Sequence, residues 1–215
     1  MNKPMRIDFV SDVACPWCAV GLNALERALE KSGIEAEVHM QPFELNPTMA
    51  AEGADAAQYL KAKYGMGDEQ LALNRARIVE RGAAEGFAFG LRSHVWNTFD
   101  AHRLLHWAGL EGGSGAQRAL KHALLKAYHG EGRNPGAHDV LLELAAQLGL
   151  NVERARDVLA SGAFTDEVRQ AERFWQEAGI QAVPAVVVNR RHLISGGQPS
   201  EVFEQALRQI AAASE

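Results

Sequence analysis

Two cysteines separated by two residues are the strongest chemical signal in the sequence. The motif is Cys15-Pro16-Trp17-Cys18, and the chain of 215 residues contains no other cysteine. Thiol–disulfide exchange needs an attacking thiolate, a second thiol that resolves the mixed disulfide, and access for a partner. A helix N-terminus favours the Cys15 thiolate, and Cys18 lies one turn further along. The spacing therefore predicts Cys15 as the attacking thiol and Cys18 as the resolving thiol.

The two residues between the cysteines agree with this interpretation. Pro16 is tolerated in the first turn of a helix, where its missing N–H costs no hydrogen bond. Trp17 is expected to flank the exposed sulfur as an apolar contact for partners. We therefore predict that both residues contribute to substrate binding.

Half of a zinc site is the alternative interpretation of the cysteine pair. Structural zinc takes four ligands, and only histidines such as His102 and His106, one helical turn apart, are available to complete the set. No Glu lies between these histidines as it does in the H-E-x-x-H pattern. We predict that the protein has no metal site, and a buried, inert cysteine pair is the remaining alternative.

Hydrophobic periodicity indicates the elements that position the pair. Residues 6–11 are typical of a short buried strand, and a helical pattern runs from Pro16 to a stop at Gly33. Alternation over residues 35–45 predicts a second strand. A strand, a helix and a strand in this order form a parallel crossover unit, with the cysteine pair at its first turn.

A helical block then interrupts this pattern. From about residue 54 to about residue 150 no strand signal survives, and helical spacing covers 55–64, 68–85, 97–110, 115–129, 137–149 and 151–160. Glycine-rich breaks at 112–115 and 130–136 separate some of these helices. After the block we predict a helix at 164–178, strands at 185–188 and 191–195, and a closing helix at 201–212.

This order of elements predicts an α/β fold. A β-α-β half comes first, a large all-helical insertion follows, and an α-β-β-α half closes the chain. Without the insertion, the order is that of the thioredoxin topology. We therefore divide the chain into a first thioredoxin-like part at 1–50, a helical insertion domain at 51–160 and a second thioredoxin-like part at 161–215.

A proline ahead of the third strand supports the redox interpretation. Val183-Pro184 directly precedes the β-branched strand at 185–188. In thioredoxin-like folds a cis proline occupies this position, lies against the cysteine pair and holds the substrate chain. We predict a cis bond here with Val183 in substrate binding; a strand-initial trans proline is the alternative.

Several polar residues are weaker candidates. Asp12, three residues before Cys15, either relays a proton to the thiol or caps the following turn. Asn97 begins a helical pattern and is expected to be its N-cap, with substrate binding as a second role. Surface positions are predicted for other histidines, including His122, His129 and His138.

Composition excludes several classes of partner. The net charge is −5 and no basic stripe is present, so nucleic acid and anionic membranes are not expected partners. No apolar run approaches the roughly 18 residues that a membrane span requires. The N-terminus lacks the apolar segment and cleavage site of a secretory signal, which predicts a cytoplasmic protein.

Five segments of the chain resemble a known family. The first, Ser11-Asp12-Val13-Ala14-Cys15-Pro16-Trp17-Cys18, resembles the opening motif of the DsbA-like family that includes FrnE proteins. The similarity continues through residues 41–47, 97–104, 182–184 and 195–199, and so spans nearly the whole chain, the helical insertion included. The resemblance implies Cys15 as the attacking thiol, Cys18 as the resolving thiol and Pro184 as the cis proline.

The same superfamily contains 2-hydroxychromene-2-carboxylate isomerases and kappa-class glutathione transferases. These typically carry Ser where Cys15 stands and lack the second cysteine, so the presence of both thiols here favours exchange chemistry. We predict a thiol–disulfide oxidoreductase that acts on protein or small-molecule disulfides and thiols, without a bound cofactor and with glutathione as a candidate redox partner.

Two alternative functions remain open. One is a glutathione-dependent isomerase or transferase, with Asn46, Asn97 and the Pro184 loop lining its glutathione pocket. The other is a chaperone-like binding module that uses the helical block, with the cysteines as a redox switch.

Overall fold

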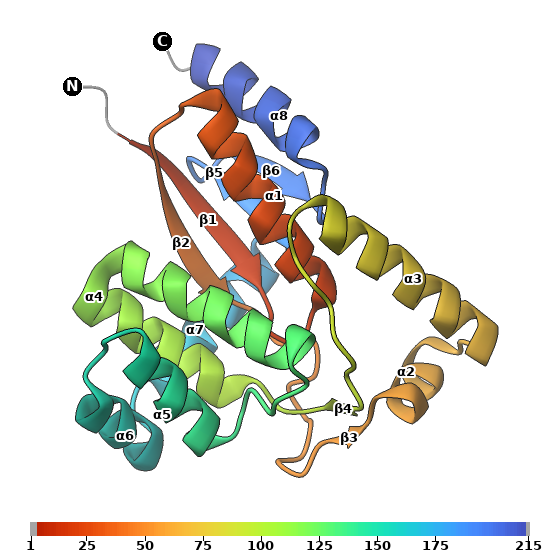
Figure 1. Ribbon diagram of the computed structural model, residues 1–215. Helices are drawn as coiled ribbons and strands as arrows, with labels where there is room; N and C mark the ends of the chain where they lie inside the picture. The colour runs from red at the N-terminus through yellow and green to blue at the C-terminus, as the bar shows by residue number, and fades with distance from the viewer. Residues whose placement is uncertain (1–3, 214–215) are drawn as a thin grey trace.

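A four-stranded sheet joins the two ends of the chain. The computed structural model describes residues 4–213 (Figure 1). The sheet has the order β2-β1-β5-β6, with β1 at Met5–Ser11, β2 at Ala36–Pro42, β5 at Ala185–Val188 and β6 at His192–Ser195. β1 pairs in parallel with β2 and antiparallel with β5, and β5 pairs antiparallel with β6. α1 (Pro16–Ser32) makes the parallel crossover from β1 to β2. The thioredoxin topology predicted from the order of elements is confirmed.

Helices cover both faces of this sheet. α1 and α8 (Ser200–Ala212) pack together on one face, where Phe9 and Leu22 belong to the main hydrophobic core. α7 (Thr165–Glu177) lies on the other face, where Val10 and Trp175 share a smaller core. Successive residues of a strand point to opposite faces, so β1 contributes to both cores. β1 is thereby fixed on both sides just before the cysteine motif begins.

The helical insertion has a core of its own. It contains α4 (Phe99–Leu125), the short π-helix η1 (Lys126–Gly130), α5 (His138–Gln147) and α6 (Val152–Ser161). Val13 and Ala14, which follow β1, pack into this core beside residues such as Trp107 and Leu120. The loop that carries the cysteine motif is therefore held between the sheet and the insertion.

The insertion agrees with the sequence predictions in one detail and differs in another. The helices expected at 97–110 and 115–129 are two helical segments on either side of a kink at Gly113, whose φ of 72° glycine adopts without strain, and η1 continues the second segment. Two-residue strands, β3 (Ala54–Asp55) and β4 (His94–Val95), pair with each other. The prediction that the block lacks strands is therefore wrong, because a two-residue strand is too short to show a period.

Two further helices form an arm beside the sheet (Figure 1). They are α2 (Ala56–Tyr64) and α3 (Asp68–Ala84), and α3 packs against α1. Their buried residues are Ala56 in α2 and Gly82 in α3. Because α2 and α3 bury so little of their own surface, a long face of these two helices stays exposed beside the start of α1.

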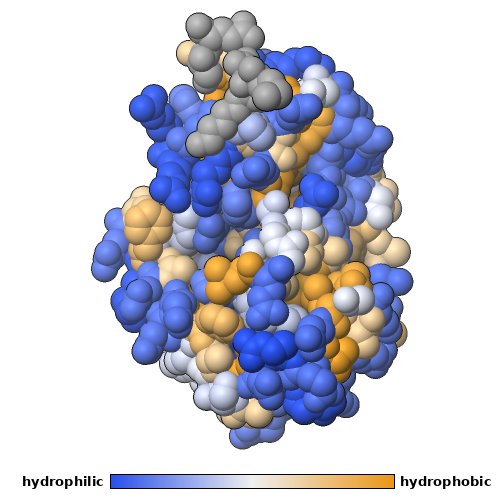
Figure 2. Space-filling model, turned by 90° about the vertical axis from the view of Figure 1, so that its left-hand side faces the viewer, coloured by the Kyte–Doolittle hydropathy of each residue, from blue (hydrophilic) through white to orange (hydrophobic). Residues whose placement is uncertain are grey.

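α4 covers the free edge of β2. The Gln117 side chain accepts a hydrogen bond from the Met40 N–H at 2.8 Å and donates to the Met40 carbonyl at 3.2 Å. A side-chain amide thus satisfies backbone groups that an edge strand would otherwise expose. Figure 2 shows the side of the molecule that carries β2 and α4, where hydrophilic side chains dominate and apolar ones gather in patches between them.

Candidate active site

The cysteine pair lies where β1 gives way to α1. Cys15 is the N-cap residue of α1 with an extended backbone, and Pro16 occupies the start of the helix. The Cys18 N–H donates to the Cys15 carbonyl at 3.1 Å and closes the first turn. Cys15 keeps 4% of its surface exposed and Cys18 keeps none. Of the two sulfurs, only that of Cys15 is accessible to a partner, as an attacking thiol must be.

The surroundings of the two thiols push their pKa values apart. A hydrogen bond from the Cys18 thiol is the largest influence on Cys15 and lowers its pKa, against the opposing effect of burial. Backbone N–H groups of Trp17 and Cys18 lower the pKa of Cys15 further, as expected at a helix N-terminus. Burial raises the pKa of Cys18 well above that of an ordinary thiol, and the neighbouring Cys15 raises it again. The geometry favours a thiolate at Cys15 and a protonated thiol at Cys18.

Alkylation of Cys15 by iodoacetamide should therefore reach its half-maximal rate below about pH 8.5, the pKa of a free thiol. The rate follows the thiolate fraction, which the Cys18 hydrogen bond increases. Rates measured against pH, with the modified residue identified by mass spectrometry, give the midpoint. In Cys18→Ala protein the midpoint should move upward, because the largest influence that lowers the pKa is removed. A wild-type midpoint at or above that of a free thiol would contradict the assignment.

The loop before β5 lies against the pair. The Val183–Pro184 peptide bond is cis. The Cys15 thiol donates to the Val183 carbonyl at a Sγ–O distance of 3.5 Å. Gly21 on α1 permits this approach, because a Cβ at that position would come within 3.0 Å of the Pro184 ring. The loop and the first turns of α1 therefore form one contiguous surface around the Cys15 sulfur.

Four hydrogen-bonding groups surround the carboxylate of Asp12, which lies three residues before Cys15. Its buried carboxylate accepts from the Ala14 N–H at 3.1 Å, the Thr98 hydroxyl at 2.8 Å and the Leu45 N–H at 2.7 Å. His102 Nε2 lies 3.3 Å from Oδ1 of the same carboxylate. Burial raises the pKa of Asp12, but His102 and the two backbone N–H groups outweigh it, so the pKa is lowered overall. Asp12 caps the turn and remains a fixed negative charge below the cysteines.

A cleft of about 740 Å³ opens beside the Cys15 sulfur. The arm of α2 and α3 forms one wall, and residues 181–183 border it near the cysteine motif. Pro16, Trp17 and Val183, all predicted to bind substrate, line this cleft together with Cys15. The structure thus brings four of the eight predicted site residues, Cys15 among them, to one cavity.

The charge of the cleft is opposite to that of the whole chain. Arg75, Arg77 and Arg92 line it, and no Asp or Glu among residues 4–213 does. Arg75 donates to the Gly90 carbonyl at 3.1 Å, and Arg92 to the Ala14 carbonyl at 3.2 Å. A chain of net charge −5 therefore presents a largely apolar cleft with a positive rim at its accessible thiol.

Asn97, like Cys18, Asp12 and Pro184, is a predicted site residue that does not line the cleft. Its amide donates to the Met49 carbonyl at 3.0 Å, and its oxygen accepts from the Phe99 N–H at 2.8 Å. The N-cap residue of α4 is Thr98, one residue later than predicted. The Asn97 side chain nevertheless satisfies an N–H group at the start of that helix, which is the chemistry of a cap.

Sequence reasoning missed two buried basic residues beside the pair. The prediction that His129 lies at the surface is wrong: it is 2% exposed, its Nε2 lies 2.8 Å from the Val13 carbonyl oxygen, and burial lowers its pKa to about 3. Lys121 on α4 is fully buried. Its one signal in the sequence is a position next to Leu120 in an apolar helical pattern, where a lysine is rare.

The histidines of the zinc interpretation face other partners. His102 lies against Asp12, and the ring of His106 lies 5.2 Å from the Phe164 ring, centroid to centroid. Within the described part of the chain, no three His, Cys, Asp or Glu residues are grouped as metal ligands would be. Zinc analysis of the purified protein remains the direct measurement.

Known proteins share this fold and its arrangement along the chain. Residues 6–208 match the family described as DSBA-like thioredoxin domain. The crystal structure of a probable DsbA oxidoreductase from Streptomyces coelicolor is 39% identical, with a TM-score of 0.86 over 95% of this chain and 89% of that one. A 2-hydroxychromene-2-carboxylate isomerase is 16% identical, with a TM-score of 0.74 over 98% of each chain. Cytosolic disulfide reductase DsbM from Pseudomonas aeruginosa, solved with GSH, is 21% identical, with a TM-score of 0.66 over 96% of this chain and 99% of its own.

Proposed function

Because the chain belongs to the DsbA-like thioredoxin domain family, we propose that it is a thiol–disulfide oxidoreductase working through Cys15 and Cys18. The observation that carries this proposal is the asymmetry of the pair, with one accessible thiol of lowered pKa and one buried thiol of raised pKa. The Cys15 thiolate attacks a substrate disulfide and forms a mixed disulfide. Cys18 then attacks the Cys15 sulfur and releases the reduced substrate. A thiol donor returns the oxidised pair to its reduced state.

The substrate chain is proposed to lie in the cleft beside the cis-proline loop. The Val183 carbonyl already accepts a hydrogen bond from the Cys15 thiol, so it is near enough to contact a group bound to that sulfur. Pro16 and Trp17 supply apolar contact on the other side of the sulfur. Pro184 completes the site by holding this loop against α1.

The proposed compartment is the cytoplasm, where thiols are kept reduced and the pair would act as a reductase. No helix within residues 4–213 has both the length and the apolar character needed to cross a membrane. The structural neighbour from Pseudomonas aeruginosa is described as a cytosolic disulfide reductase, which is compatible with this direction of electron flow.

The function is tested by the reduction of insulin disulfides with dithiothreitol as the electron donor. The aggregation of the released B chain reports the rate, and the protein should shorten the lag well below that of the donor alone. A lag equal to that of the donor, from protein whose Cys15 can still be alkylated, would contradict the proposal.

A glutathione-dependent isomerase or transferase is the second candidate, favoured by the positive cleft and by a structural neighbour solved with GSH. Glutathione is anionic, and an arginine-lined cleft suits an anionic thiol. Conjugation of glutathione to chlorodinitrobenzene that survives Cys18→Ala, without insulin reduction by the wild type, would favour this candidate. The exchange mechanism depends on both thiols. It therefore requires that the wild type reduces insulin and that Cys18→Ala protein does not.

Arg77→Gln should slow the attack of Cys15 on glutathione disulfide by about 3- to 5-fold at low salt, the effect of losing one exposed charge contact. The rate with hydroxyethyl disulfide, which is neutral, should not change. Stopped-flow measurement of the first exchange step gives both rates. Arg173→Gln removes an exposed arginine of α7 that does not line the cleft and is the matched control. Equal loss with both disulfides would contradict a role for charge in the cleft.

A further inference from the structure

Arg92 differs from the other two arginines of the cleft. Arg75 and Arg77 are exposed on α3, whereas Arg92 is half-buried in the segment between α3 and β4. Its Nη1 donates to the Ala14 carbonyl at 3.2 Å. That carbonyl belongs to the peptide bond between Ala14 and Cys15. Arg92 therefore touches the backbone directly before the attacking thiol.

The guanidinium of Arg92 is held in place by the structure around it. Its central carbon lies 5.3 Å from the centroid of the Tyr128 ring, on η1. The backbone two residues earlier is also fixed on η1. The Gly90 N–H donates to the His129 carbonyl at 2.9 Å, and a Cβ on Gly90 would collide with the Gly130 carbonyl oxygen. A donor that is already fixed loses little freedom when it binds a ligand.

No carboxylate among the described residues neutralises the charge of Arg92. Within residues 4–213 this arginine forms no ion pair, and no Asp or Glu from that range lines the cleft. A guanidinium carries several N–H donors in a planar fork that fits a carboxylate, and the Ala14 carbonyl engages Nη1 alone. A half-buried arginine that lines a cleft and pairs with no acid indicates that an anionic group of a ligand binds there.

Tyr64 connects Arg92 with Cys15 across the cleft. It is the last residue of α2 and lines the cleft, with 51% of its surface exposed. Burial raises the pKa of the Tyr64 phenol, the Cys15 charge raises it further, and the Arg92 charge lowers it. Both charges therefore act on one phenol of the cleft wall, which agrees with the contact of Arg92 to the Ala14 carbonyl.

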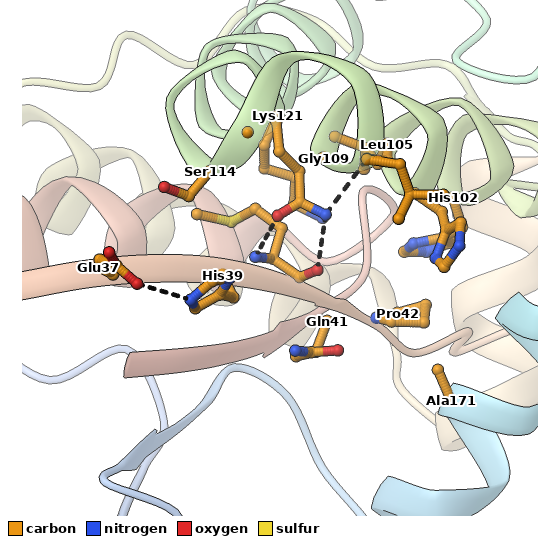
Figure 3. A pocket seen from close by; sticks show the side chains of 15 residues that line it. Glu37, His39, Gln41, Pro42, His102, Leu105, Gly109, Ser114, Lys121 and Ala171 are labelled. Carbon is orange, nitrogen blue, oxygen red and sulfur yellow. Dashed lines mark hydrogen bonds and ion pairs between the residues drawn. The ribbon is translucent and has the colours of Figure 1, made fainter. Parts of the chain in front are cut away.

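The cavity between β2 and α4 lacks this combination of groups. It has a volume of about 540 Å³, and neither a cysteine nor an arginine from residues 4–213 lines it. Figure 3 shows Glu37 and His39 on β2, joined by an ion pair of 3.6 Å, with His102 on α4 beyond them. The Glu37 carboxylate would repel an anionic ligand. The cleft, in contrast, combines an accessible thiol with positive charge.

We propose that Arg92 binds a carboxylate close to the reacting sulfur of the substrate, and that the protein thereby selects disulfides with a negative charge beside the disulfide bond. The proposal rests on the proposed exchange function and adds the substrate class. The Cys15 thiolate attacks one sulfur of the disulfide. A bond between Cys15 and that sulfur forms, the disulfide bond breaks, and the other half leaves as a thiolate. The substrate is the oxidant, so this step needs no further reagent. The carboxylate at Arg92 holds the attacked half in place.

Three disulfides of similar length test the preference for charge. Dithiodipropionate is anionic, hydroxyethyl disulfide is neutral and cystamine is cationic. Reduced protein is mixed with excess disulfide and quenched with maleimide, and mass spectrometry gives the reduced protein that remains. Each rate is divided by that of mercaptoethanol, because the leaving thiols differ in pKa. The wild type should then prefer dithiodipropionate to cystamine by about tenfold or more, the effect of one charged hydrogen bond, with hydroxyethyl disulfide between them.

Arg92→Gln should lower this preference about tenfold, because the charged hydrogen bond is lost. The preference is a ratio of two rates, so a general loss of activity through a displaced Cys15 loop does not change it. Arg92→Lys keeps the charge and should stay within about threefold of the wild-type preference. Arg173→Gln, which changes an exposed arginine outside the cleft, is the matched control and should leave it unchanged. A wild-type preference in Arg92→Gln, or an equal loss in Arg92→Lys, would overturn the proposal.

Peptide disulfides extend the comparison to polypeptide substrates. One peptide carries Glu next to its cysteine, and its counterpart carries Gln at that position. A preference for the Glu peptide that Arg92→Gln removes would assign the site to protein substrates as well. A preference confined to dithiodipropionate would assign it to small disulfides, and both results support a carboxylate at Arg92. Absence of a preference in both comparisons would overturn the proposal.

The wild type supplies a test that does not depend on how the variants fold. Suberate has the length and charge of dithiodipropionate, with two methylene groups in place of the sulfurs, and cannot react with a thiol. At millimolar concentration it should slow the attack on dithiodipropionate, whereas octanediamine at the same ionic strength should not. Equal inhibition by both compounds, or by neither, would overturn the proposal. Failure of Cys15 to react with any of the three disulfides would instead contradict the exchange function itself.

Discussion

Replacing Cys15 by serine is expected to reduce insulin reduction to the rate of the electron donor alone, a loss of about 10³-fold or more. The sulfur of Cys15 is the only cysteine sulfur with access to the cleft, since Cys18 is fully buried. A serine hydroxyl is not ionised at neutral pH and cannot form a disulfide. The substitution exchanges one atom, and a serine hydroxyl can still donate to the Val183 carbonyl, so the fold should persist. Turbidity measurements at equal protein concentration give the ratio of rates.

Cys18→Ser is the matched control, because it makes the same chemical change three residues away. It should also lose turnover, yet it keeps Cys15 and should still take up one equivalent of dithiobis(nitrobenzoate). Cys15→Ser should take up none while the protein remains folded. Circular dichroism and the melting temperature report the fold of both variants. Insulin reduction by Cys15→Ser near the wild-type rate would refute the assignment of the attacking thiol.

Elements with a clear local period could be predicted from the sequence. The strand at 185–188 and the helices of the insertion follow from periods of two and of about 3.6 residues, which need no knowledge of distant contacts. The break expected in the glycine-rich segment 112–115 is present, because the non-helical backbone of Gly113 separates two helical segments. Across this kink, the Gln117 side chain donates to the Leu105 carbonyl at 3.2 Å, and Leu104 and Leu120 pack in one hydrophobic core.

The site could be predicted where its signal is local. Cys15 and Cys18 mark the start of a helix by themselves, whereas the burial of Lys121 depends on how α4 packs against the rest of the protein. His129 illustrates the same limit: its neighbours in sequence are compatible with an exposed position, and only the contact of η1 with the loop after β1 buries it. Contacts between residues about a hundred positions apart leave no periodic trace in the sequence.

Cys18→Ala is expected to convert the protein into a trap for its substrates. In the wild type, Cys18 lies one helical turn from Cys15 and resolves the mixed disulfide intramolecularly. The chain has no third cysteine, so in the variant only an outside thiol can do this. Loss of an intramolecular nucleophile should lengthen the life of the mixed disulfide by about 10²-fold or more. Cell extract passed over tagged variant protein should yield adducts that dithiothreitol dissolves, seen on non-reducing gels and identified by mass spectrometry.

The Cys15→Ser/Cys18→Ala double variant separates covalent capture from ordinary binding. It keeps the cleft and its arginines, so proteins that bind without a disulfide should be retained by both variants and can be subtracted. Capture of glutathione alone would favour the isomerase or transferase candidate, because that activity needs a glutathione site but no protein disulfide. If Cys18→Ala protein captures nothing while iodoacetamide still modifies Cys15, then the thiolate is reactive without being an exchange catalyst. That result would contradict the proposed function, since Cys15 attack on a disulfide must leave a bond that only a second thiol can break.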